Sequence, residues 1–215
     1  MIWIFGDSYS VAFDDEKNVR PHISEKYINY KGYVPKMYFQ LLSEYFNDEY
    51  KNYSFGAMDN SFIFLRFMEN HYKIKDNDLV IFNWTSIDRF KYEKENNWMS
   101  SGNIDYSILS ENTLKELRLN RRNNLYYKEQ STIIKFIDSY LKNNKVVHWT
   151  WRDKSQDIRI KRMDLTIMNE TNDEILDFHY GEIGQQFLFN EIKDQLTKLS
   201  NVKIDMDYFI TKPLI

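Results

Sequence analysis

The chain reads IWIFGDS over residues 2–8, and this stretch decides the expected fold. Four apolar residues form a short buried strand, which Gly6 breaks at once. Asp7 and Ser8 follow directly, so an acid and a hydroxyl stand where the strand ends. Open sheets of parallel strands carry their binding and catalytic groups at the carboxyl ends of the strands. The stretch therefore predicts a first strand with Ser8 at the functional edge of such a sheet.

Apolar runs and amphipathic stretches alternate along the rest of the chain. Strands are predicted at 50–55, 79–82 and 145–149, and helices at 34–46, 60–72, 126–141 and 181–199. Strands separated by helices predict a three-layer α/β/α sandwich around a mostly parallel, flavodoxin-like doubly wound sheet. Polar residues 90–124 are expected to form an insertion or a lid, and residues 152–175 a second irregular excursion. No linker divides residues 1–215, which predicts one domain.

The composition narrows the class of protein. With 215 residues, 17% aromatic and 28% charged, the chain is expected to be globular. The net charge of −3 gives no reason to expect a nucleic-acid partner. The chain has no cysteine, and its 4 histidines are spread widely, so neither a metal site nor a cofactor is expected. No apolar run is long enough for a membrane span and no signal peptide is recognised, which predicts a cytoplasmic protein with no membrane partner. The sequence leaves the oligomeric state open.

Polar groups are expected to converge at one edge of the sheet, because the carboxyl ends of parallel strands share that edge. The loops that follow the strands read GDS at 6–8, GAMDN at 56–60, NWTS at 83–86 and WTW at 149–151, and DFHYG at 177–181 precedes the last helix. They supply a hydroxyl, amide donors and an acid–histidine pair. These are the groups that acyl transfer needs.

The first and last of these segments resemble a known family, the SGNH (GDSL-type) hydrolases. FGDS at 5–8 matches the family's first block, and DFHYGEIG at 177–184 is similar to its last block. The middle blocks match more loosely: Gly56 corresponds to the second block of the family, and residues 79–86 correspond to the third. The resemblance covers the whole chain in order. It implies a serine esterase that forms an acyl-Ser8 intermediate without a cofactor.

The resemblance assigns a catalytic triad of Ser8, His179 and Asp177. The serine hydroxyl needs a base within hydrogen-bond reach, and His179 is that base, with Asp177 holding its ring. The family's acid commonly lies three residues before the histidine, whereas here position 176 is Leu and Asp177 lies two before. Side chains at i and i+2 share a face in an extended chain, so Asp177 can still reach the ring. Asp7 is expected to brace the first loop.

An oxyanion would be met by the backbone N–H groups of Ser8 and Gly56 and by a polar side chain of the third loop. Many family members carry Gly-x-Asn-Asp there, whereas this chain has NWTS at 83–86. Asn83 is the expected amide donor. If Asn83 instead occupies the position of the glycine in Gly-x-Asn-Asp, then Thr85 or Ser86 lies nearest the position of the family's asparagine and is the alternative donor.

Four further residues are candidates for substrate binding, each with a structural alternative. Asn60 either touches substrate or caps the following helix, and Arg89 pairs with either a substrate carboxylate or an acid of the protein. Trp84 and Trp151 are expected in rim loops, where their rings can stack on a sugar, although tryptophan usually packs in a core. His148, beside two valines in a strand, is expected to pack.

The predicted substrate is a small-molecule or carbohydrate ester. O-acetyl groups on a carbohydrate are favoured by the expected rim tryptophans, an argument from analogy since fold does not fix substrate. An O-acyltransferase with the same triad would use a sugar hydroxyl in place of water. A non-catalytic member that binds a glycan or a protein is the other alternative, and the irregular third block keeps it open.

Overall fold

The computed structural model describes residues 1–12, 25, 28–85, 89, 91–94, 97–100, 110–112, 115, 119, 125–150, 160–162 and 181–201. Within them, a five-stranded sheet has the order β2-β1-β3-β6-β7. Its strands are β1 (Ile2–Phe5), β2 (Tyr50–Asn52), β3 (Leu79–Trp84), β6 (Lys145–Thr150) and β7 (Ile160–Arg162). Every neighbouring pair is parallel. Phe5, the last residue of β1, pairs with Phe82 of β3, so the loop that leaves β1 begins beside Asn83, which still belongs to β3.

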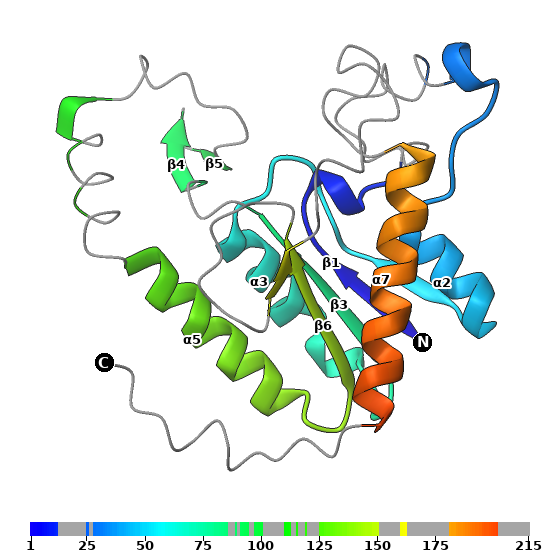
Figure 1. The fold of residues 1–215 in the computed structure, drawn as a ribbon. Helices are drawn as coiled ribbons and strands as arrows, with labels where there is room; N and C mark the ends of the chain where they lie inside the picture. The colour runs from blue at the N-terminus through cyan, green and yellow to red at the C-terminus, as the bar shows by residue number, and fades with distance from the viewer. Residues whose placement is uncertain are drawn as a thin grey trace.

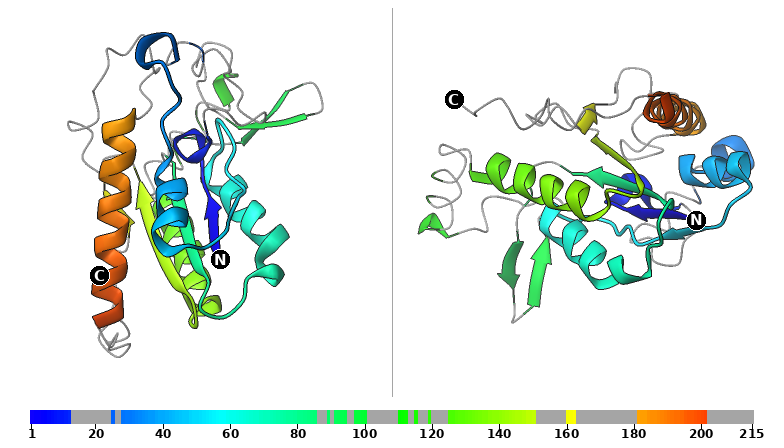
Figure 2. Two further views of the ribbon diagram at one scale, coloured as in Figure 1. Left: turned by 90° about the vertical axis from the view of Figure 1, so that its right-hand side faces the viewer. Right: turned by 90° about the horizontal axis from the view of Figure 1, so that it is seen from below.

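Helices cover both faces of the sheet, which confirms the predicted three-layer α/β/α fold (Figures 1 and 2). Helices α2 (Tyr38–Phe46) and α7 (Glu182–Asn201) pack on one face, and α3 (Asn60–Asn70) and α5 (Leu125–Tyr140) on the other. A short 3-10 turn, η1 (Ser8–Ser10), follows β1. A second one, η2 (His71–Lys73), follows α3.

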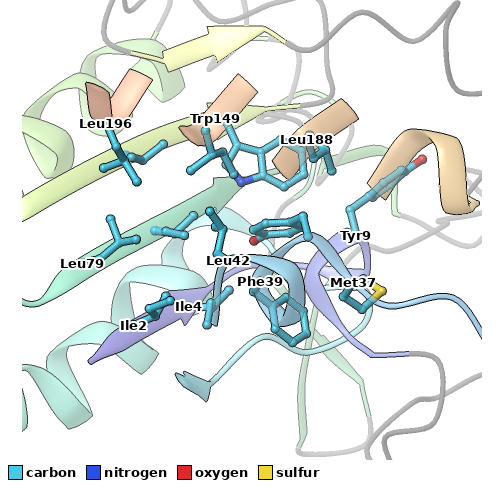
Figure 3. Packing of buried hydrophobic residues seen from close by; sticks show 14 of the residues in the cluster. Ile2, Ile4, Tyr9, Met37, Phe39, Leu42, Leu79, Trp149, Leu188 and Leu196 are labelled. Atoms are coloured by element: carbon cyan, nitrogen blue, oxygen red, sulfur yellow. The ribbon is translucent and has the colours of Figure 1, made fainter. Parts of the chain in front are cut away.

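The alternation of side chains along β1 builds the two cores. Ile2 and Ile4 point to the face covered by α2 and α7, whereas Trp3 and Phe5 point to the face covered by α3 and α5. Figure 3 shows Ile2 and Ile4 packed with residues of both helices on the first face. Complete burial of such an aliphatic side chain stabilises the fold by about 1.5–3 kcal/mol. Because a strand buried on both faces must be apolar throughout, this four-residue run could be recognised from the sequence.

The amino end of β1 is held by a buried carboxylate. Asp78 accepts hydrogen bonds from the Trp3 indole at 2.8 Å, from the Lys75 backbone N–H at 2.9 Å and from the Met1 amino group at 3.2 Å. Burial alone would raise the pKa of Asp78, but these donors outweigh it and lower the pKa below its usual value. Asp78 therefore stays ionised and fixes the start of β1 against the turn before β3.

The strands differ from the prediction at their ends. β3 continues through Trp84 and β6 through Thr150, two and one residues beyond the predicted ends. β2 stops at Asn52 and is shorter than expected. A fifth strand, β7, lies where an irregular excursion was predicted. The predicted insertion contains an antiparallel pair, β4 (Lys91–Lys94) and β5 (Asn97–Ser100).

Among the described residues, no helix combines the length and the apolar character needed to cross a membrane.

Candidate functional site

Ser8 lies at the carboxyl end of β1, as predicted, and begins η1. Asp7 caps this turn, because its Oδ1 accepts a hydrogen bond from the Tyr9 backbone N–H at 3.0 Å. The Ser10 N–H donates to the Asp7 carbonyl at 3.0 Å. Asp7 and Ser10 are both fully buried, whereas Ser8 is half-buried. The turn thus fixes the backbone on both sides of Ser8 and leaves that residue partly exposed.

The Asp7 carboxylate is buried but well paired. Asn83 donates its side-chain amide to Oδ1 at 2.9 Å, and Arg89 donates through Nη1 to Oδ2 at 3.2 Å. An isolated buried carboxylate would cost several kcal/mol, so these donors are needed to keep it in place. Asp7 therefore braces the first loop, in agreement with the sequence-based hypothesis.

Asn83 does not stand on a loop. It lies inside β3, is completely buried, and its amide nitrogen contacts both Asp7 Oδ1 and Ser10 Oγ at 2.9 Å. Both amide hydrogens are used within the protein, and neither is left for an oxyanion. The expected oxyanion role of Asn83 is therefore corrected to a bracing role. The reason is the extra length of β3, which draws Asn83 into the sheet.

Gly6 is required by the close approach of β1 and β3. A Cβ atom at this position would lie 2.7 Å from the Asn83 Cβ and 3.1 Å from the Ser10 Oγ. Contacts under 3 Å are not tolerated between carbon atoms, so only glycine allows Asn83 to reach the first loop. The glycine of the GDS motif is thus explained by its neighbour in the sheet.

A polar chain runs from the first loop into α2 and α7. The Ser10 and Tyr38 hydroxyls are 2.8 Å apart, and the Tyr38 backbone N–H donates to Gln185 Oε1 at 2.9 Å. Burial raises the pKa of Tyr38 far above its usual value, so its hydroxyl remains neutral. This chain joins η1 to the first turn of α7. The sequence-based reasoning missed Ser10, Tyr38 and Gln185, because nothing in the local pattern distinguishes them from surface polar residues.

The second loop, which follows β2, lies directly beside the first loop, which follows β1. The Phe55 backbone N–H donates to the Gly6 carbonyl at 3.1 Å, and the Asn52 amide donates to the Ser10 carbonyl at 2.6 Å. Gly56 follows in a turn and is half-buried. The next residue, Ala57, has a φ of 61°, a left-handed conformation that costs a non-glycine residue about 1–2 kcal/mol. The backbone that carries Gly56 is thus held in a strained turn, and the residue before it, Phe55, is hydrogen-bonded to Gly6.

Asn60 binds the backbone that follows β3. Its Oδ1 accepts from the Thr85 N–H at 2.9 Å, and its Nδ2 donates to the Thr85 carbonyl at 3.2 Å. Asp59, not Asn60, caps α3, since its side chain accepts from the Phe62 N–H at 2.9 Å. The capping alternative for Asn60 is therefore wrong, and its side chain joins α3 to the end of β3.

Thr85 is held at this point by both backbone groups and is buried. Its hydroxyl has no hydrogen-bond partner among the described residues.

Trp84 is a core residue. It is completely buried, stacks on Phe82 with ring centroids 5.3 Å apart, and donates its indole N–H to His148 Nδ1 at 3.0 Å. His148 Nε2 in turn contacts Asp138 Oδ1 at 2.9 Å. The expectation that Trp84 lies in a rim loop is corrected: β3 is longer than predicted, and the alternation of side chains turns Trp84 into the core. The packing predicted for His148 agrees with its position.

Four of the expected site residues, Ser86, Trp151, Asp177 and His179, lie outside the described residues. Within the described part, no group of three or more histidines, aspartates and glutamates is arranged to hold a metal ion.

Comparison of the chain with models of protein families, with characterised proteins and with solved structures gives no match. The site must therefore be interpreted from its own geometry. In that geometry the ends of β1, β2 and β3 lie together. Hydrogen bonds hold the backbone on either side of Ser8, which is half-buried.

Proposed function

We propose that the protein is a serine ester hydrolase of SGNH type that works through an acyl-Ser8 intermediate. The observation that carries the proposal is the environment of Ser8. Its neighbours Asp7 and Ser10 are buried and hydrogen-bonded to β3 and α2, whereas Ser8 itself keeps exposed surface. A nucleophile needs this combination, because a rigid support fixes its position while the hydroxyl remains accessible.

In the proposed reaction, His179 removes the proton of the Ser8 hydroxyl as Oγ attacks the ester carbonyl carbon. Asp177 orients the histidine ring and stabilises its charged form. The bond from carbon to the alcohol oxygen then breaks, and the alcohol leaves with the proton from His179. Water reverses these steps, releasing the acid and free Ser8.

Two backbone donors are proposed for the oxyanion, the N–H groups of Ser8 and Gly56. The contact from the Phe55 N–H to the Gly6 carbonyl supports this pairing, because it places the two loops side by side. Since the Asn83 amide is engaged with Asp7 and Ser10, a third donor must come from another group. Thr85 and Ser86 are the remaining side chains proposed from the third loop.

The start of α7 supports the assignment of His179. Gln185, in the first turn of α7, binds the Tyr38 backbone, and the Tyr38 hydroxyl contacts Ser10, two residues from Ser8. His179 lies two residues before Gly181 in the sequence, and two residues of chain span at most about 7 Å. The hydrogen-bonded link from α7 through Tyr38 to Ser10 is what supports the proposal that His179, which precedes this helix in the sequence, serves as the base.

Within this proposal, a carbohydrate O-acetyl ester remains the favoured substrate. Trp84 no longer supports that preference, because its ring is buried. The preference now rests on Trp151, which follows β6 directly in the sequence.

Labelling with a fluorophosphonate probe, together with turnover of a short-chain aryl ester, tests the proposal. The wild-type protein is expected to be labelled and to release the aryl alcohol, and Ser8→Ala and His179→Ala are expected to lose both activities. Ser43→Ala is the matched control, because the Ser43 hydroxyl donates to the Asp48 carbonyl in an exposed hydrogen bond at the end of α2. An unlabelled wild-type protein, or undiminished labelling of Ser8→Ala, would contradict the proposal. Acyl transfer to an added sugar at the expense of hydrolysis would indicate the transferase instead.

A further inference from the structure

We propose that Arg89 is a positioning residue that sets the spacing between the first and second loops, and with it the spacing of the two backbone donors for the oxyanion. The inference rests on the proposed function and goes beyond it. Of the two sequence-based alternatives for Arg89, a substrate carboxylate or an acid of the protein, it builds on the second, because Arg89 pairs with Asp7.

The contacts of one guanidinium nitrogen carry the inference. Arg89 Nη1 donates to Asp7 Oδ2 at 3.2 Å and to the Met58 carbonyl at 3.1 Å. Asp7 immediately precedes Ser8, and Met58 follows Gly56 by two residues. A single nitrogen atom thus contacts both loops, each within two residues of the backbone N–H that the mechanism requires.

The charge and burial of the pair make this contact firm. The Asp7 side chain is completely buried and that of Arg89 is only 14% exposed, so water screens their attraction weakly. A charge-assisted hydrogen bond in such a place is stronger than a neutral one. Arginine stays charged at any physiological pH and holds its donors in a fixed plane, whereas lysine is a flexible point charge.

The two loops are also joined at their bases, through the Phe55 N–H and the Gly6 carbonyl. Loss of Arg89 is therefore expected to loosen the loops without separating them. Loosening the donors weakens a contact that forms fully only in the transition state, which lowers kcat and changes KM little. Removing a whole oxyanion donor lowers kcat by about 10²–10³, so misplacing the donors is expected to cost about 10–10².

The experiment compares kcat and KM for a short-chain aryl ester, and the rate of fluorophosphonate labelling, in wild type, Arg89→Ala and Arg89→Lys. Arg89→Ala is expected to lose kcat by about 10–10² with KM changed less than about threefold, and Arg89→Lys to lose less. Guanidinium ion added at millimolar concentration is expected to restore part of the kcat of Arg89→Ala. Arg66→Ala is the matched control, because Arg66 forms an exposed pair with Glu69 and is expected to behave as wild type.

A second variant covers the case in which Arg89→Ala fails to fold because the buried Asp7 carboxylate loses the positive charge that faces its Oδ2. The double variant Asp7→Asn/Arg89→Gln removes both charges and with them the ion pair between the two loops. Circular dichroism checks that this variant folds. It is expected to show the same loss of kcat, without rescue by guanidinium. Wild-type kcat in the folded single or double variant would overturn the inference, and so would a raised KM at unchanged kcat. A wild-type protein that is neither labelled nor active would refute the proposed function itself, and the inference with it.

Discussion

The side-chain amide of Asn83 donates a hydrogen bond to the carboxylate of Asp7 across 2.9 Å, which joins the third strand of the sheet to the loop that follows the first. The same amide nitrogen contacts Ser10, on the other side of Ser8. The proposed nucleophile is thus flanked by two residues that a single asparagine holds. The GDS stretch at 6–8 is held in place by a residue of β3, and this has consequences that can be measured.

Gly6→Ala is expected to destabilise the protein by about 1–3 kcal/mol, because the new methyl group would lie 2.7 Å from the Asn83 Cβ in a packed site. Urea unfolding measures the loss. Gly32→Ala is the matched control: Gly32 has a φ of 83°, and among the described residues no atom apart from those of its chain neighbours lies within 4 Å of the added Cβ, so backbone strain is the effect expected there. The interpretation fails if Gly6→Ala unfolds at the same urea concentration as wild type.

Asn83→Ala is expected to lower the free energy of unfolding by about 1–3 kcal/mol, since Asp7 and Ser10 each lose a buried donor. Asn83→Asp is expected to be worse, because it places a second carboxylate against a buried one. Thermal unfolding orders the variants. A fall in turnover of about 10²–10³ in Asn83→Ala with unchanged stability would instead restore the oxyanion role.

Asn60→Ala tests how the end of β3 is held. The variant loses two hydrogen bonds to the Thr85 backbone, at 2.9 and 3.2 Å, and is expected to be destabilised by about 1–2 kcal/mol. Asn60→Asp keeps the acceptor for the Thr85 N–H and loses only the donor, so it should lie between Ala and wild type. Urea unfolding of the three proteins checks the order. If Asn60→Ala were as stable as wild type, the two contacts would contribute nothing.

The sequence predicted what depends on local pattern. The apolar runs of β1 and β3 and the amphipathic helices determine the three layers. A strand that is buried on both faces is apolar throughout, whereas a helix that is buried on one face repeats its apolar residues every three or four positions. The contacts between Asp7, Asn83 and Arg89 leave no such pattern, since they join residues 76 and 82 positions apart. The errors at Asn83 and Trp84 have one cause. β3 extends two residues beyond its apolar run, through an asparagine whose partners lie in another loop and a tryptophan that packs in the core.

Asp78 links stability to pH. Its pKa is lowered from 3.8 in the folded protein by the donors from Lys75 and Trp3 and by the Met1 amino group, which outweigh burial. A carboxyl group with a depressed folded pKa contributes stability above its unfolded pKa and loses it as the pH falls through the folded value. Asp78→Asn is therefore expected to be about 1–3 kcal/mol less stable than wild type at neutral pH. The difference should shrink as the pH falls below 3.8.

Urea unfolding across this pH range measures the difference in stability. Asp76→Asn is the control, because it changes an exposed contact to Asn143. A constant difference between wild type and Asp78→Asn at every pH would show that packing, not the charge of Asp78, holds the start of β1.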